Sequence, residues 1–228
     1  MQTNHNRVRE IRAHRWQGHA LAAVIFACAM LALGFTSCAS AKKFAYEGIG
    51  RDSEQQPERV VSELHLKPGE RIADIGAGGG YFTWRLADAV GPTGKVYAVD
   101  IDPDMTGYLA ATAGQRGYRN VEAILAAPDD PKLPAGSVDL IFTCNTYHHI
   151  ENRAAYFARL KRSLAPGAHV AIIDYRPEGF FQSIHSHSTA ADAIRREMTE
   201  AGYRLEKEYD FLPGQNFLVF VPADARAS

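Results

Sequence analysis

The residues whose types and spacing favour ligand binding lie in one glycine-rich segment at 74–80. This segment follows a short apolar stretch at 71–75 and precedes a stretch with helical spacing at 81–90. Glycines at such a junction let the backbone approach a ligand closely, and the first turn of the helix offers N–H groups to an anion. The dinucleotide-binding pattern G-x-G-x-x-G fails in both registers, at Tyr81 and at Thr83. The segment instead reads acid-x-Gly-x-Gly-x-Gly.

A second group of chemically active residues follows the apolar stretch at 138–143, where the sequence reads Cys-Asn-Thr-Tyr-His-His. His148 and His149 are candidate catalytic residues, because an imidazole accepts a proton near neutral pH. The alternative is that one of them packs at the corner between strand and helix and the other supports a neighbouring group. Cys144 is interpreted as a packing residue. A His-Ser-His segment at 185–187 reads as an exposed loop, so no metal site is expected.

These groups need a scaffold, and the chain supplies one by alternating strands and helices from residue 60 onward. Helices are expected between the strands, for example at 81–90 and 190–201. The strands are expected at 71–75, 95–99, 121–125, 138–143, 169–173, 204–210 and 216–221. Repeated strand–helix units indicate an α/β, doubly wound, mostly parallel seven-stranded sheet, and the last two strands indicate a C-terminal antiparallel hairpin. Ligands bind such sheets at the carboxyl ends of the strands.

The first 38 residues have the pattern of an export signal. Four arginines within residues 1–20 precede an uncharged apolar run at 21–35 and then Thr36-Ser37-Cys38. The run is shorter than the roughly 20 residues that a membrane-spanning helix needs. The alternative is that the run forms a buried core helix. The start of such a helix would then be joined to an arginine-rich tail without partners for its charges.

The end of this run resembles a bacterial lipobox, in which the cysteine is lipidated and becomes the first residue. Cys38 matches, whereas Phe35 replaces the usual aliphatic residue. We therefore expect a signal peptide at 1–38, a tether and N-terminal cap segment at 39–58 and one folded domain at 59–228. The expected location is the cell envelope, lipid-anchored through Cys38 and facing the periplasm. The alternatives are an uncleaved anchor, plain secretion, or the cytoplasm if the signal does not work.

The glycine segment resembles motif I of class I S-adenosylmethionine-dependent methyltransferases, which is an acid followed by G-x-G-x-G. Asp74, Gly76, Gly78 and Gly80 match this motif position by position. The segment at 164–168, Leu-Ala-Pro-Gly-Ala, is similar to the turn that the family has before its fifth strand. The resemblance extends over about 60–221 and points to the methyltransferase type 11 group, with a Rossmann-like methyltransferase fold. Locally, 66–100 also resembles protein-isoaspartate methyltransferases.

This resemblance implies S-adenosyl-L-methionine as the cofactor. In the family, the loop and its acid hold the methionine part. The acid at the second strand tip, here Asp100, binds both ribose hydroxyls, and Ile101 would lie against the adenine. The family often has a polar residue after the third strand to contact the adenine amino group. Here Ala-Ala-Pro occupies this tip, and the contact would be made either by Asp129 or Asp130 or by the backbone. The cofactor-binding residues that the resemblance implies are Asp74, Gly76, Ala77, Gly78, Gly80, Asp100, Ile101, Asp129 and Asn145.

The implied activity is methyl transfer to a small or lipid-like acceptor. A formal net charge of -1 and an isoelectric point near 6.8 provide no strong field to attract nucleic acid, so no nucleic-acid partner is expected. Thr146 and Tyr147 replace the prolines of members that methylate amino groups in nucleic acids, which argues in the same direction. The alternative is a non-catalytic exported binding or interaction protein that retains the fold, because S-adenosylmethionine is made in the cytoplasm.

Overall fold

A computed structural model of the protein describes residues 51–177 and 188–224. These residues lie within one compact unit at 46–228. The expected signal peptide at 1–38, its lipidation site Cys38 and the His-Ser-His segment at 185–187 lie outside the described residues. Within the described ranges, no helix combines the length and the apolar character needed to cross a membrane.

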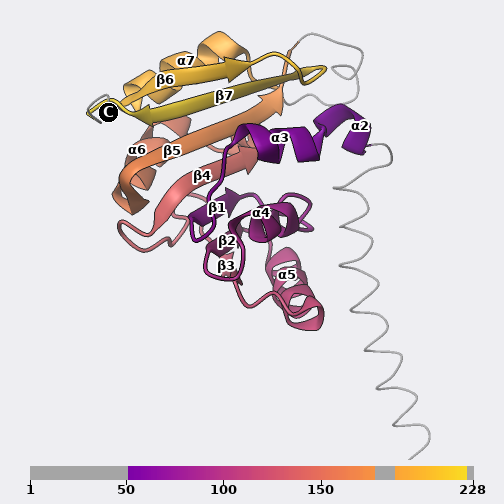
Figure 1. Ribbon diagram of the computed structural model, residues 1–228. Helices are drawn as coiled ribbons and strands as arrows, with labels where there is room; N and C mark the ends of the chain where they lie inside the picture. The colour runs from indigo at the N-terminus through magenta and orange to yellow at the C-terminus, as the bar shows by residue number, and fades with distance from the viewer. Residues whose placement is uncertain (1–50, 178–187, 225–228) are drawn as a thin grey trace, which may run out of the picture. The chain divides into compact units, whose positions relative to one another are not determined.

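The described residues form a seven-stranded sheet in the order β3-β2-β1-β4-β5-β7-β6 (Figure 1). The strands are β1 Arg71–Ile75, β2 Lys95–Asp100, β3 Val121–Leu125, β4 Val138–Cys144, β5 Leu164–Tyr175, β6 Tyr203–Tyr209 and β7 Gln215–Pro222. Strands β1 to β5 pair in parallel, whereas β7 runs antiparallel between β5 and β6. The predicted fold class, a mostly parallel seven-stranded sheet with a C-terminal antiparallel hairpin, is confirmed.

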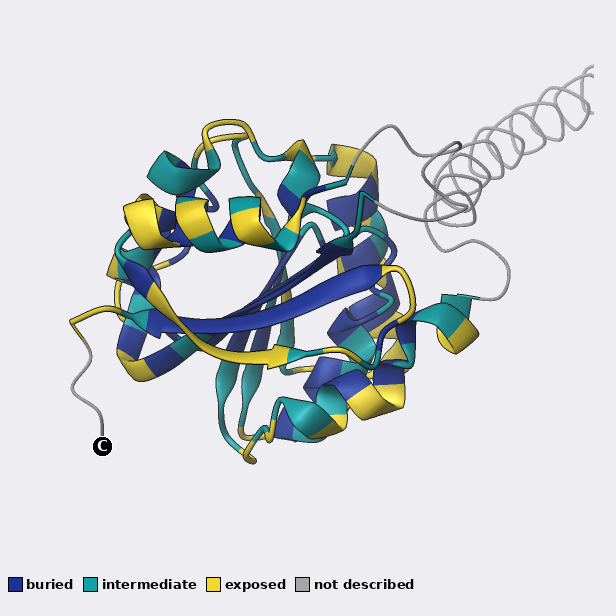
Figure 2. Ribbon diagram, turned by 90° about the horizontal axis from the view of Figure 1, so that it is seen from above, coloured by how far each residue is buried: buried dark blue, intermediate teal, exposed yellow. Residues whose placement is uncertain are grey.

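Helices connect the strands and cover both faces of the sheet (Figure 2). They are α2 Arg51–Gln55, α3 Pro57–Glu63, α4 Thr83–Val90, α5 Pro103–Arg116, α6 Arg153–Leu160 and α7 Ala191–Glu200, with 3-10 turns η1 Tyr147–His149 and η2 Lys161–Ser163. Helix α5 begins as its sequence predicts, because Asp102 accepts a hydrogen bond from the Asp104 N–H and proline follows the cap.

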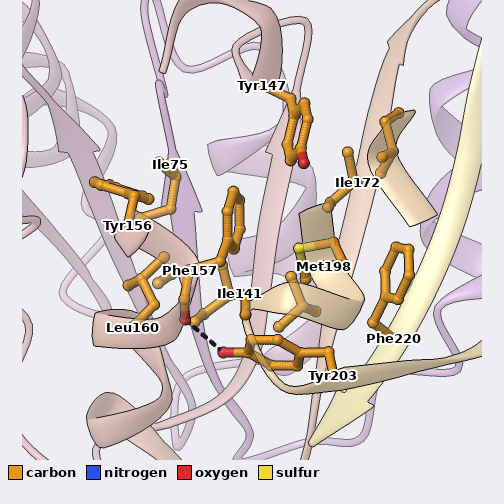
Figure 3. Close-up of a cluster of buried hydrophobic side chains, with 14 of the residues drawn as sticks. Ile75, Ile141, Tyr147, Tyr156, Phe157, Leu160, Ile172, Met198, Tyr203 and Phe220 are labelled. Atoms are coloured by element: carbon orange, nitrogen blue, oxygen red, sulfur yellow. Dashed lines mark hydrogen bonds between the residues drawn. The ribbon is translucent and has the colours of Figure 1, made fainter. Parts of the chain in front are cut away.

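Two large apolar clusters, one on each face, hold helices to the sheet, and a smaller third cluster joins Leu109 of α5 to Ala98 of β2. One contains Val60 of α3 and the apolar stripe of α4, packed on β1, β4 and β5. The other joins α6 and α7 to the opposite face through residues such as Phe157, Met198 and Phe220 (Figure 3). In that cluster the Tyr203 hydroxyl donates a 3.0 Å hydrogen bond to the Phe157 carbonyl. The polar group of this tyrosine side chain is therefore satisfied inside the core.

Several element boundaries differ from the sequence prediction by one or two residues, and the start of β5 differs by more. Strand β5 begins at Leu164 rather than at 169, because Leu164 already pairs with Val138, and the Pro-Gly turn forms an irregularity inside the strand. At the other end of the chain, α3 spans the expected division between residues 58 and 59, so the segment expected to be a tether and cap ends inside a helix.

Candidate active site

The glycine loop lies directly against the tip of β4. The N–H groups of Gly76 and Ala77 both donate to the Val99 carbonyl, at 2.8 and 3.1 Å, which fixes the loop between β1 and β2. Gly76 has φ of +74°, and a Cβ at this position would lie 2.1 Å from the Thr146 Oγ1. Glycine is therefore required at 76 both by its backbone conformation and by its neighbour.

The other two glycines of the motif have different surroundings. A Cβ on Gly80 would lie 2.6 Å from Trp84 and 2.9 Å from Leu109, so Gly80 allows α4 and α5 to pack closely. A Cβ on Gly78 would meet no atom within 4 Å, although its φ is +52°. The backbone of Gly78 therefore faces open space, where a ligand can approach it.

The Asp100 carboxylate is held in place beside this open position. Its Oδ2 accepts a 2.8 Å hydrogen bond from the Gly78 N–H, and its Oδ1 accepts a 2.9 Å bond from the Asp102 N–H. A carboxylate has about four lone-pair positions, so each oxygen retains one for a further donor such as a ribose hydroxyl. Ile101 and Leu125, which flank Asp100 at the tips of β2 and β3, are 61% and 45% exposed. Apolar side chains beside an acid that has unused acceptor positions are an arrangement that fits a nucleoside.

Asp74, at the end of β1, is buried below the loop. Its Oδ2 accepts a 2.6 Å hydrogen bond from the Thr83 hydroxyl at the start of α4. Burial raises the pKa of Asp74 to about 6, the Thr83 bond opposes this rise, and smaller charge effects come from Asp100 and Arg51. Asp74 therefore links the loop to α4, and burial destabilises its ionised form.

This destabilisation predicts a pH-dependent gain in stability for Asp74→Asn. An acid whose pKa rises on folding destabilises the native state once ionised, so its effect develops between pH 4 and pH 6 and persists above. A difference of about two pKa units corresponds to about 3 kcal/mol, and we expect a gain of about 1–3 kcal/mol near pH 7.5 and little change near pH 4. Urea unfolding at both pH values measures it. An equal change at the two pH values would contradict this interpretation.

Helix α2 carries residues that the motif analysis did not identify. The Tyr81 hydroxyl donates a 2.5 Å hydrogen bond to Asp52, and the guanidinium of Arg51 lies 3.9 Å from the centre of the Tyr81 ring. At the other end of α2, Gln55 accepts a hydrogen bond from the Cys144 thiol at 3.2 Å. The helix therefore contacts both the glycine-loop side and the tip of β4.

Cys144 is buried, and burial raises the pKa of its thiol to about 12. A thiol with so high a pKa stays protonated at neutral pH and is a poor nucleophile. This finding is consistent with the packing role expected for Cys144. Among the described residues, no group of three His, Cys, Asp or Glu side chains is arranged to hold a metal ion.

The two candidate catalytic histidines lie in η1, and the structure links them to an acid that sequence reasoning missed. His148 Nδ1 lies 2.7 Å from Oδ1 of Asp174, which is buried at the end of β5. His148 Nε2 lies 3.0 Å from His149 Nε2, and His149 is exposed. No motif in the sequence around Asp174 marks it as a site residue. The parallel pairing of β4 and β5 brings it to the histidines.

The remaining predicted residues occupy the edges of the site. Asn145 has φ of +55°, and its Oδ1 accepts a 2.6 Å hydrogen bond from Gln215 of β7. Asp129 is exposed in a turn closed by the bridge between Ala127 and Asp130. Asp130 itself pairs with Arg162 at 3.0 Å. The contacts of Asp129 and Asn145 with a cofactor stay predictions.

Comparison with known proteins agrees with this geometry. Residues 72–167 match a family model described as a methyltransferase domain. The chain is 33% identical over 117 residues to protein-L-isoaspartate O-methyltransferase of Aeropyrum pernix, over 50% of this chain and 42% of that protein. It is 32% identical over 114 residues to nocamycin O-methyltransferase of Saccharothrix syringae, over 50% of this chain and 41% of that one. The chain thus spans less than half the length of these two curated relatives.

Among solved structures, a SAM-dependent methyltransferase from Aquifex aeolicus superimposes with a TM-score of 0.69 at 26% identity, over 79% of this chain and 96% of that one. A methyltransferase in complex with Trm112 from Haloferax volcanii has a TM-score of 0.66 at 16% identity, over 85% of this chain and 98% of that one, and shows likeness of fold alone. These comparisons show that residues 72–167 are similar to a methyltransferase domain and that the fold is similar to that of the methyltransferase from Aquifex aeolicus.

Proposed function

We propose that the protein transfers the methyl group of S-adenosyl-L-methionine to a small or lipid-like acceptor. The observation that carries the proposal is the arrangement of Asp100 and Gly78. The Asp100 carboxylate is already oriented, because it accepts a 2.8 Å hydrogen bond from the Gly78 N–H. The backbone at Gly78 also faces open space, so a ligand can contact the loop and the carboxylate together. Preorganised groups of this kind bind a ligand without a further ordering cost.

Each part of the cofactor would meet a different part of the site. Asp100 would accept the two ribose hydroxyls, and Ile101 and Leu125 would lie against the adenine. The loop around Gly76 to Gly78 would hold the methionine part, above the buried Asp74. S-adenosylmethionine supplies a methyl group that is already activated, so the protein's main task is to bring an acceptor into line near the tip of β4.

The names of several relatives favour a small-molecule acceptor, whereas the relative from Aeropyrum pernix is named for a protein acceptor. Similar curated proteins include an O-methyltransferase of nocamycin, an aklanonic acid methyltransferase and a ubiquinone/menaquinone C-methyltransferase. The net charge of the chain is -1, which argues against a nucleic-acid acceptor.

Isothermal titration of the purified protein with S-adenosylmethionine and S-adenosylhomocysteine tests the proposal. We expect both to bind with micromolar affinity. Incubation with methyl-labelled S-adenosylmethionine and extracts of small molecules and lipids then identifies the acceptor. If neither compound binds at millimolar concentration, the proposal that the protein is a methyltransferase is rejected. A non-catalytic interaction protein is then favoured.

We also propose that the protein is exported and anchored through a lipidated Cys38. The support is the arginine-rich start, the short apolar run and the small residues before Cys38. A single acyl chain anchors a protein only weakly, so a durable anchor requires more than one chain on that residue. Cys38→Ser should therefore abolish fatty-acid labelling and leave the precursor unprocessed. Mass spectrometry of the mature N-terminus in a bacterial host measures this, and an unlipidated wild-type chain beginning at Met1 in the cytoplasm would refute it.

A further inference from the structure

Three side chains form consecutive contacts from the interior of the protein to its surface, in the order Asp174, His148 and His149. Asp174 is fully buried, and its Oδ2 has no hydrogen-bond partner. The His148 side chain is 7% exposed and lies 2.7 Å from Asp174, while the exposed His149 lies 3.0 Å from His148. The imidazole centres of the two histidines are 4.1 Å apart. Two ring nitrogens at 3.0 Å must share a proton, because two lone pairs at this distance repel each other.

The acid determines which nitrogens carry protons. An ionised Asp174 only accepts hydrogen bonds, so a neutral His148 carries its proton on Nδ1 and leaves Nε2 with a lone pair. His149 must then donate from its own Nε2, which leaves the lone pair of a neutral His149 on Nδ1. The buried carboxylate thus sets the protonation of His149, a residue that it does not contact. This is the arrangement of a proton relay, in which each ring can accept on one side and donate on the other.

We propose that these three residues accept the proton of a methyl acceptor whose nucleophilic atom arrives protonated, as in the hydroxyl of a phenol or an enol. The inference rests on the proposed function and specifies its acceptor class. As the acceptor oxygen bonds to the methyl carbon, the carbon–sulfur bond breaks and its electron pair stays on sulfur. The hydroxyl proton passes to His149 Nδ1, the Nε2 proton of His149 passes to His148 Nε2, and the resulting imidazolium of His148 stays paired with the Asp174 carboxylate.

In this scheme His149 is the catalytic residue that meets the acceptor, and His148 and Asp174 are positioning residues that act through it. The burial of the two inner groups supports this order, since an acceptor reaches the exposed ring first. A methyl acceptor that arrives with a lone pair and no proton would need none of the three. General-base assistance contributes about 10²- to 10⁴-fold to reactions that need it.

Nitrogen NMR of the histidine rings in the unliganded protein tests the relay without any acceptor. Under conditions in which the nitrogen shifts show both rings to be neutral, we expect His148 in the Nδ1–H form and His149 in the Nε2–H form. Asp174→Asn offers an amide donor to His148 Nδ1, which moves the His148 proton to Nε2. His149 should then change from the Nε2–H to the Nδ1–H form, although residue 174 does not touch it. Glu206→Gln is the matched control, because Glu206 pairs with His169 at 3.0 Å elsewhere and should leave both relay signals unchanged.

An unchanged His149 signal in Asp174→Asn, or a wild-type His148 protonated on Nε2, would overturn the relay. If the asparagine variant does not fold, Asp174→Ala tests the same expectation, because His148 without its acceptor reverts to donating from Nε2. Turnover of an acceptor identified by methyl labelling gives a second readout. His149→Ala should lower kcat at least about 100-fold and leave the affinity for S-adenosylhomocysteine within twofold. Unreduced turnover in this variant rejects the relay alone, whereas failure of the wild type to bind S-adenosylhomocysteine rejects the proposed function.

Discussion

Asp100→Ala is expected to weaken the binding of S-adenosylhomocysteine by about 30- to 1,000-fold, which corresponds to about 2–4 kcal/mol. The carboxylate would make two charge-assisted hydrogen bonds to the ribose, and no neighbouring group of the loop can replace them. The variant also removes the acceptor for the N–H groups of Gly78 and Asp102, so part of the loss reflects a less ordered loop. Isothermal titration measures the change in affinity, and thermal unfolding shows whether the domain stays folded.

Two further variants separate these contributions. Asp100→Asn retains one oxygen that can accept the Gly78 N–H, but it places an amide NH2 against the Asp102 N–H, so we expect it to keep part of the loop order and to lose less affinity than the alanine variant. Asp104→Ala removes the same charge from the first turn of α5 without touching the Gly78 N–H, and its affinity should stay within about threefold of the wild type. If Asp100→Ala bound as tightly as Asp104→Ala, the ribose assignment would be wrong.

Much of the fold was predictable because the information is local. The apolar strands at the centre of the sheet are nearly continuous, as buried parallel strands should be, and β1 was located to the residue. Asp102 and Pro103 marked the start of α5 through well-understood capping chemistry. The start of β5 was predicted wrongly, because a Pro-Gly pair usually interrupts a strand, whereas pairing of Leu164 with Val138 continues the ladder across it.

The glycine-loop part of the candidate site was predictable from a motif, whereas the histidine part depends on contacts between distant residues. Asp74, Gly76 and Gly78 stand close together in the sequence, so their spacing alone indicates a loop. Asp174 and His148 are 26 residues apart, and no local pattern connects them. The contact between Gln55 and Cys144 spans 89 residues. Such pairs become visible only when the strand order is known, because the carboxyl ends of β1, β4 and β5 then lie side by side.

The three glycines of the motif lead to the second large expected effect, since each has different surroundings in the structure. Gly78→Val should abolish detectable binding of S-adenosylhomocysteine while the domain remains folded. A valine side chain at 78 meets no protein atom close to its Cβ, so it extends into the space that the ligand would occupy. The cost to stability is the left-handed backbone conformation, about 1–2 kcal/mol for a residue with a Cβ. Titration calorimetry and urea unfolding of the same sample measure both quantities.

Gly136→Val is the matched control, because Gly136 has a similar φ of +61° and a Cβ there also meets nothing within 4 Å. It should lose comparable stability and bind S-adenosylhomocysteine normally. Gly76→Val should behave differently from both, since its side chain would overlap Thr146 and force the tips of β1 and β4 apart. We expect that variant to lose several kcal/mol of stability, in the range of an overpacked core. Normal binding by Gly78→Val would show that the open side of the loop serves packing alone, and the cofactor would then have to bind elsewhere.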